Sequence, residues 1–179
     1  MHDYGGMGPI FSLNGVTPKI APDAFIAPTA AVIGDVEIGS ETGVWFHCLI
    51  RGDMNFVRIG ARTNIQDGTV VHIDSGGFST TIGDDVTIGH NAVIHACTIH
   101  NRGFVGISAT VLDGAVIEEG GMLGAGGLLT PGKVIGKNEL WTGSPAKLRR
   151  VMDEDERKKF DRNALVYLEL ARKFRASSR

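Results

Sequence analysis

The chain has 179 residues and a formal net charge of −2, with 18 basic and 20 acidic side chains. That length suits one domain with a hydrophobic core, and the near-neutral charge argues against nucleic-acid or anionic-membrane partners. No stretch approaches the roughly 18 consecutive apolar residues of a membrane span, and the N-terminus lacks a signal-peptide pattern. Two cysteines, Cys48 and Cys97, are too few for a disulfide framework. We therefore expect a cytoplasmic protein that binds neither nucleic acid nor membranes.

Glycine is abundant, with 25 residues spread along the chain, which makes internal repeats the first feature to examine. Aliphatic residues recur every six positions from Ile20 onward. This period differs from the ~3.6 of an α-helix and the ~2 of a half-buried strand, and from the roughly 8–12-residue turn spacing of a β-sandwich. It fits short strands that meet at regular turns, with three strands in a coil of about 18 residues. We therefore predict a mainly β protein, a parallel β-helix of hexapeptide repeats.

The repeat divides the chain into three parts. Residues 1–19 form an N-terminal lead-in with a possible short strand at 10–13, residues 20–147 form the β-helix, and residues 148–179 form a C-terminal helix. The acidic run at 153–156 suits the first turn of that helix, and one helix face is apolar. Acids and bases mix on the other face, which favours packing along a side of the β-helix over binding to a membrane surface.

Three polar residues share one position of the repeat. Arg51, His72 and His95 each follow an aliphatic residue of the hexad by one place. Two insertions interrupt the period, one of three residues after Ile50 and one of five residues after Val71. If both insertions are loops, the three polar residues lie in one column on successive coils. Because neighbouring strands are ~4.8 Å apart, His72 and His95 can both reach one metal ion.

A second column holds Asp67 and His90, each two places after its aliphatic residue. His90 precedes His95 by five residues, roughly 16 Å of extended chain, so it lies on the previous side of the coil and cannot easily join His72 and His95. A cyclic homotrimer would bring the second column of one subunit against the first column of the next. A third histidine would then complete the site across the interface, where Arg51 and Asp67 could form an ion pair.

Three neutral imidazoles with an open fourth position are what a catalytic zinc ion needs. Such an ion lowers the pKa of its bound water to about 7, and cobalt or iron(II) would also accept these ligands. Gln66 lies one side before His72 and is placed to orient the bound water or a small substrate. A competing interpretation puts the histidines on the surface of a trimeric scaffold, but three histidines at matching column positions favour metal binding.

The same residues resemble those of the γ-class carbonic anhydrase-like proteins, a family of left-handed hexapeptide β-helices. The segments that carry the resemblance are Arg51–Gly52–Asp53, Asn64 to Gly68, His72, Gly89–His90, His95, and Gly143 to Lys147. The resemblance implies a left-handed coil and a homotrimer with a metal ion at each interface. It implies roles for His72, His90 and His95 as metal ligands, for Gln66 beside the metal-bound water, and for Arg51, Asp53 and Asp67 in organising the interface and the site.

The activity that this resemblance implies is reversible hydration of CO2 to bicarbonate, with zinc-bound hydroxide as the nucleophile of a lyase. The chain departs from the best-known active members at Met54, where they carry a glutamate that passes the proton to solvent. Asp74 follows the first ligand closely and is a weak candidate for that relay. The alternatives are acyl transfer or thioester hydrolysis on an acyl-CoA, and a trimeric scaffold with little catalysis.

Overall fold

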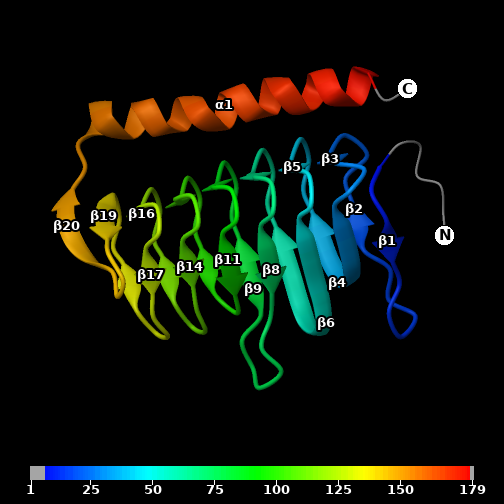
Figure 1. Ribbon diagram of the computed structural model, residues 1–179, viewed down its shortest axis with the longest axis horizontal. Coiled ribbons are helices and arrows are strands. Elements are labelled where there is room, and N and C mark those ends of the chain that lie inside the picture. The colour runs from blue at the N-terminus through cyan, green and yellow to red at the C-terminus, as the bar shows by residue number, and fades with distance from the viewer. Residues whose placement is uncertain (1–6, 178–179) are drawn as a thin grey trace.

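The computed structural model of the chain describes residues 7–177, so the first six residues of the expected lead-in lie outside the described part. The fold is a left-handed parallel β-helix whose coils stack along the long axis of the molecule. One long helix, α1 (Glu154–Ser177), runs beside the coils (Figure 1). The mainly β class and the C-terminal helix predicted from the sequence are therefore confirmed.

Each coil has three sides, and strands on the same side pair in parallel from coil to coil. The first side contains β1 (Ile10–Phe11), β8 (Val70–His72), β11 (Val93–His95), β14 (Thr110–Val111) and β17 (Leu128–Leu129). The second side contains β2 (Lys19–Ile20), β9 (Thr80–Ile82), β12 (Thr98–Ile99), β15 (Val116–Ile117) and β18 (Val134–Ile135). The long strands β4 (Ala31–Ile38) and β6 (Leu49–Ile59) belong to both sides and join them into one 12-stranded sheet.

The third side is an 8-stranded sheet. It contains β3 (Phe25–Ile26), β5 (Gly43–Val44), β7 (Asn64–Ile65), β10 (Thr87–Ile88), β13 (Phe104–Val105), β16 (Met122–Leu123), β19 (Glu139–Thr142) and β20 (Lys147–Val151). The last of these strands pairs with β19 in the antiparallel sense and lies at the end of the stack. The hexad period does not predict it, because an antiparallel end strand falls outside the repeat.

The aliphatic residue of each hexad points into the coil and stacks on its counterpart in the next coil. Ile99, for example, pairs in register with Ile82 in the preceding coil and Ile117 in the following one. All three side chains are no more than 1% exposed. Strands of two or three residues bury too little apolar surface alone, so the stability of each coil comes from its neighbours.

Replacing Ile117 by Ala is expected to lower the free energy of unfolding by about 2–5 kcal/mol, because it leaves a cavity inside a fully buried ladder. Thermal or urea unfolding of the purified protein measures the change. Val116→Ala is the matched control, since Val116 lies on the same strand and is partly exposed. Its cost should stay near 1 kcal/mol or less. Equal costs for the two variants would contradict the ladder as the source of stability.

The two insertions in the hexad differ in structure. The five-residue insertion lies in the loop 73–79 between β8 and β9, as expected. The column count assumes that the three-residue insertion is also a loop, but its extra residues lie inside β6. The register between β4 and β6 shifts after Gly34, so the extended strand bulges where it turns the corner between two sides. Asp53 and Met54 lie in this bulge.

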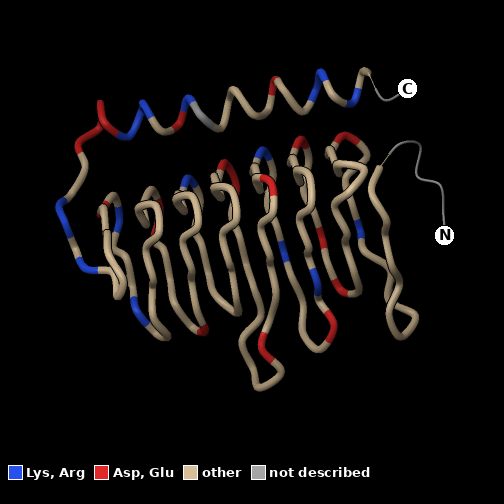
Figure 2. The backbone as a smooth tube through the Cα atoms, in the orientation of Figure 1, with Lys and Arg blue, Asp and Glu red and all other residues tan. Residues whose placement is uncertain are grey.

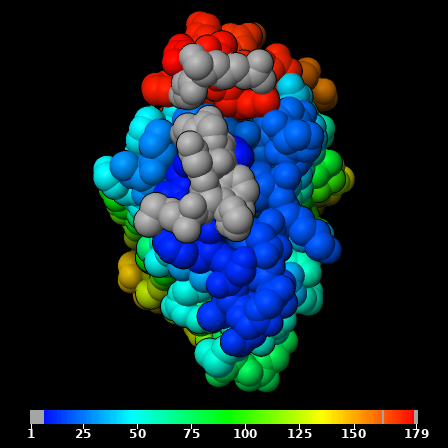
Figure 3. Space-filling view, turned by 90° about the vertical axis from the view of Figure 1, so that its right-hand side faces the viewer, coloured from blue at the N-terminus to red at the C-terminus, as the bar shows by residue number. Residues whose placement is uncertain are grey.

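The helix α1 begins after Asp153, whose Oδ1 accepts a hydrogen bond from the Glu156 N–H at 2.8 Å. Acidic residues gather in this first turn (Figure 2), where the positive end of the helix dipole stabilises them. The helix then runs back toward the N-terminal coils, and in the end-on view it lies across the top of the stack (Figure 3). Within residues 7–177, no helix is both long and apolar enough to cross a membrane.

Contacts near both ends fix α1 against the third side. Near its start, the buried Arg157 donates a hydrogen bond to the Arg102 carbonyl oxygen at 3.0 Å. Near its end, the Phe174 ring packs edge-to-face on Trp45, with ring centroids 5.6 Å apart. Tyr167 also packs against Trp45, at 5.4 Å. The helix therefore spans most of the stack and presents Tyr167 to the middle coils.

Candidate metal centre

His72 and His95 end neighbouring strands of the first side. The two residues are paired in register between β8 and β11, as the column count predicts. His72 Nδ1 lies 3.3 Å from His95 Nε2. Two nitrogens bound to one tetrahedral zinc at about 2.0–2.1 Å are themselves about 3.3–3.4 Å apart. The spacing of this pair therefore fits two ligands of a single metal ion.

Each of these histidines also contacts a carboxylate through its other ring nitrogen. His72 Nε2 lies 3.0 Å from Asp53 Oδ1, and His95 Nδ1 lies 2.5 Å from Asp113 Oδ1. Metal-binding histidines typically donate their second N–H to a carboxylate, which fixes the ring and leaves the first nitrogen free to bind. The nitrogens left free by the two carboxylates are the two that face each other.

The charges around His72 favour its neutral form. Partial burial lowers the pKa of His72, and the positive charges of Arg51 and His95 lower it further. Arg51 in turn forms an ion pair with Asp53 in the same chain. Because a metal ion binds the neutral imidazole, this environment keeps His72 ready to bind at neutral pH.

His90 lies in the second column, on the turn that leads into β11. Its Nδ1 is 2.9 Å from Asp67 Oδ2, and its Nε2 is 3.3 Å from the Tyr167 hydroxyl. Asp67 Oδ1 also accepts a hydrogen bond from the Phe46 N–H at 3.2 Å. Among residues 7–177, no three His, Cys, Asp or Glu side chains gather closely enough to hold a metal ion. His90 is therefore separate from the pair of His72 and His95 within one chain.

Gln66 is held in place by a buried hydrogen-bond chain. Its side chain is 6% exposed, and its Nε2 donates to Asn64 Oδ1 at 3.1 Å. The Asn64 amide in turn donates to Thr87 Oγ1 at 2.9 Å. Gln66 directly precedes Asp67, so the structure places it on the same corner as His90.

Asp74 and Met54, the two residues that bear on proton transfer, lie in different surroundings. Asp74 Oδ2 accepts a hydrogen bond from the Gly76 N–H at 2.9 Å, so its carboxylate closes a turn at the start of the loop 73–79. Met54 is 66% exposed and lies beside Asp53 at a small cavity of about 230 Å³. No contact between the Asp74 carboxylate and a histidine is found within the described residues.

An apolar row separates the two columns on the outer surface of the first side. It consists of Leu49, Val70, Val93 and Leu128, which each precede an inward aliphatic residue, and Thr110 interrupts it between Val93 and Leu128. Val70 and Val93 are 37% and 38% exposed. A flat row of this kind is typical of a surface that another subunit covers.

Two residues at the site were not predicted from the sequence, Asp113 and Tyr167. A signal for Asp113 exists, since His95 and Asp113 each precede an inward isoleucine, Ile99 or Ile117, by four places. Counting forward from the preceding aliphatic residue hides this match, because the repeat is one residue short between Ile94 and Ile99. Tyr167 has no such signal, because its contact with His90 depends on how α1 docks.

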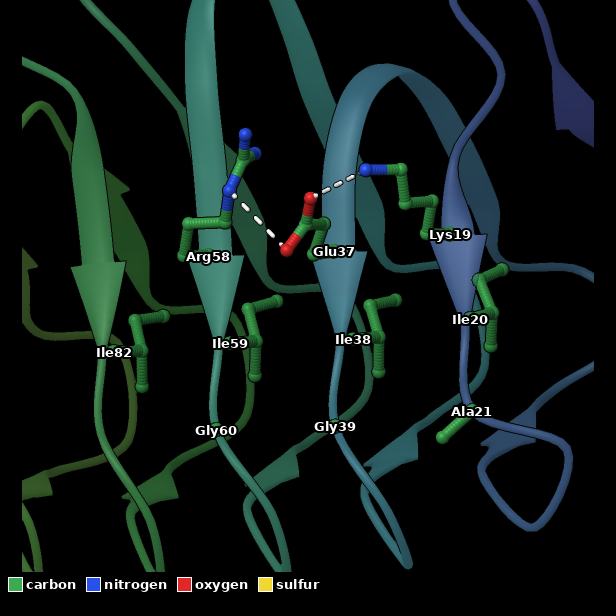
Figure 4. Close-up of a pocket in the computed structure, with 10 residues that line it drawn as sticks. All are labelled: Lys19, Ile20, Ala21, Glu37, Ile38, Gly39, Arg58, Ile59, Gly60 and Ile82. Atoms are coloured by element: carbon green, nitrogen blue, oxygen red, sulfur yellow. Dashed lines mark hydrogen bonds and ion pairs between the residues drawn. The ribbon is translucent and has the colours of Figure 1, made fainter.

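A surface cavity of about 550 Å³ lies on the second side near its N-terminal end. Figure 4 shows Lys19, Glu37 and Arg58 in an ion-paired row above a ladder of four isoleucines. A third cavity, of about 280 Å³, lies between α1 and the coils. None of the three is lined by His72, His90 or His95.

Known proteins are similar to this chain in sequence and in fold. The chain is 44% identical over 160 residues to gamma carbonic anhydrase 2, mitochondrial, of Arabidopsis thaliana, covering 87% of this chain but 58% of the plant protein. It is 40% identical over 167 residues to a carbonic anhydrase of Geobacillus kaustophilus, covering 93% of this chain and 91% of that protein.

Among solved structures, a hexapeptide transferase family protein from Anaplasma phagocytophilum superposes with a TM-score of 0.88 at 45% identity. The superposition covers 92% of this chain and 97% of that one. No family model matches the chain.

Proposed function

Because this chain belongs to the γ-class carbonic anhydrase-like family of hexapeptide-repeat β-helices, we propose that it is a zinc lyase that hydrates CO2 reversibly to bicarbonate. The observation that carries the proposal is the spacing of His72 and His95, which fits two ligands of one tetrahedral ion. The carboxylate behind each candidate ligand supports it, with Asp53, Asp67 and Asp113 on His72, His90 and His95 respectively.

The proposed site lies between subunits of a homotrimer. One subunit contributes His72 and His95, and the next contributes His90 from its second column. The apolar row on the first side supports this arrangement, because it lies between the two columns and is covered when three such sides meet around an axis. Arg51 of one subunit and Asp67 of the next would then meet across the interface.

When bound, zinc in a site of three imidazoles supplies a hydroxide nucleophile at neutral pH. The residues of the chain prepare the site for it. The carboxylates hold the imidazole rings, and the Gln66 amide, fixed by Asn64, orients the oxygen of a small substrate. Asp74 remains a weak proton relay, because its carboxylate already accepts a hydrogen bond from Gly76. The three imidazoles would also accept cobalt or iron(II).

Acyl transfer or thioester hydrolysis on an acyl-CoA is the second candidate function, and the name of the Anaplasma structure favours it. Against it, a transferase that uses one histidine as general base does not need two histidines at a spacing that fits one metal ion, as His72 and His95 have. A trimeric scaffold with little catalysis is the third candidate, which the exposed Met54 favours. For location we propose the cytoplasm, where Cys48 and Cys97 remain buried free thiols.

One sample separates these candidates. We expect purified protein to contain about one zinc ion per subunit and to speed CO2 hydration in stopped-flow measurements above the buffer rate. Zinc without hydration would favour the scaffold or another small substrate. Protein that takes up no metal after reconstitution, and that instead turns over acetyl-CoA, would move acyl transfer to first place.

A further inference from the structure

We infer that Asp113 is a positioning residue of the metal centre, whose carboxylate selects the tautomer and the orientation of His95. The inference rests on the proposed metal-binding function. Its geometric basis is the alignment of three groups, with Asp113 Oδ1 2.5 Å from His95 Nδ1 and His95 Nε2 3.3 Å from His72 Nδ1. A neutral imidazole that donates its proton from Nδ1 keeps its lone pair on Nε2. The carboxylate thus directs the lone pair of His95 toward His72.

Backbone hydrogen bonds tie the corner that carries Asp113 to the corners below it. The Gly114 N–H donates to the Ala96 carbonyl oxygen at 2.8 Å, and the Ala96 N–H donates to the His72 carbonyl oxygen at 3.1 Å. These two bonds link the residue after Asp113 to the residue after His95 and then to His72 itself. Asp113, His95 and His72 therefore lie on the corners of three successive coils, and these hydrogen bonds fix the relative positions of the corners.

The loop 73–79 packs against the corner at Asp113 and Gly114 from the outer surface. Gly114 has a φ of +66°, and a Cβ there would lie 3.2 Å from the Phe78 ring. The ring therefore lies close to the Gly114 backbone, and a side chain at this position would require the Phe78 ring to shift. The loop that follows His72 thus returns to support the residue next to Asp113.

A plain surface ion pair would be the simpler interpretation. The side chains of His95 and Asp113 are 31% and 41% exposed, and pairs at that exposure contribute little to stability. A second pair, His100 with Glu118 at 3.9 Å, has similar exposure but lies away from the site. If Asp113 positions His95, its removal changes metal affinity and ring tautomer without changing stability, whereas removal of Glu118 changes neither.

The test compares Asp113→Ala, Asp113→Asn and the control Glu118→Gln with the wild type, each as the full chain. Metal-free protein labelled with 15N-histidine is examined at about pH 8, above the ordinary histidine pKa, by long-range 1H–15N spectra. His95→Gln identifies the His95 signals. We expect the Nδ1–H tautomer in the wild type, a mixture in Asp113→Ala, and an intermediate state in Asp113→Asn, whose amide oxygen still accepts.

Zinc affinity is measured on the same variants by competition with a chromophoric chelator. Removing the carboxylate that accepts a hydrogen bond from a metal-binding histidine typically lowers metal affinity about 10–100-fold. We expect a loss in that range for Asp113→Ala, with unchanged circular dichroism and oligomeric mass. A wild-type tautomer or wild-type zinc affinity in Asp113→Ala overturns the inference. If the wild type binds no zinc but Asp113→Ala still gives a mixture of His95 tautomers, Asp113 positions His95 and the proposed function fails.

Discussion

His90→Ala is expected to remove zinc from all three interfaces of the proposed trimer while leaving the β-helix folded. The reason is that each proposed site takes one ligand from His90, so the substitution removes one of three imidazoles everywhere at once. His90 contacts Asp67 and Tyr167 at the surface of its corner and contributes nothing to the aliphatic ladders. Metal analysis of the purified variant, with circular dichroism on the same sample, measures the effect.

A mixing experiment then decides whether His90 acts on the neighbouring subunit. His90→Ala and His95→Ala subunits are unfolded together and refolded into mixed trimers. In a closed ring, every mixed trimer has one interface where an intact His72–His95 pair meets an intact His90. Zinc should therefore return to the mixture although neither variant binds it alone. No recovery in mixtures shown to contain both subunits would contradict a shared site. His100→Ala, at another corner, serves as the control that keeps its zinc.

Val93→Glu is expected to convert the proposed trimer into monomers and to abolish zinc binding at the same time. Val93 lies in the apolar row of the first side and is 38% exposed in the single chain. Burying an unpaired carboxylate in a subunit interface costs several kcal/mol per subunit, which three copies around one axis multiply. Sedimentation velocity measures the oligomeric state, and the zinc content follows on the separated species.

The fold offers a matched control for this variant. Val134 precedes its inward residue Ile135 on the second side in the same way that Val93 precedes Ile94 on the first. It is 48% exposed. Val134→Glu should remain trimeric and keep its zinc, because the second side is not part of the proposed interface. Dissociation of both variants would mean that the charge destabilises the coil itself, and a trimeric Val93→Glu would exclude the first side as the interface.

The sequence predicts the coil well because the forces that build it are local and periodic. An inward aliphatic residue every six positions determines which side each strand occupies and which residues stack, so the pairing of His72 with His95 follows by counting. Counting also separates His90 from that pair. The bulge in β6 was not predicted, because three extra residues can extend a strand round a corner as readily as they can form a loop.

The remaining features depend on contacts that no period encodes. Asp113 reaches His95 only because one repeat is a residue short, which shifts the corner by one place. Tyr167 meets His90 because aromatic packing on Trp45 sets where α1 lies. The antiparallel strand β20 follows from how the chain leaves the last coil. The proposed interface forms between chains, so the fold of one chain does not determine it. The apolar row is the feature of the sequence that indicates it.

The position of α1 has a consequence for how the molecule comes apart. Stacked coils interact only with their nearest neighbours, so an unsupported stack tends to fray from its ends, one coil at a time. Here the helix is bound near its start through Arg157, beside Arg102, and near its end through Phe174, beside Trp45. An outer coil cannot peel away without releasing a helix that also holds distant coils. The helix α1 should therefore make unfolding cooperative along the whole stack. The middle coils, which carry the candidate metal ligands, should stay aligned until the whole chain unfolds.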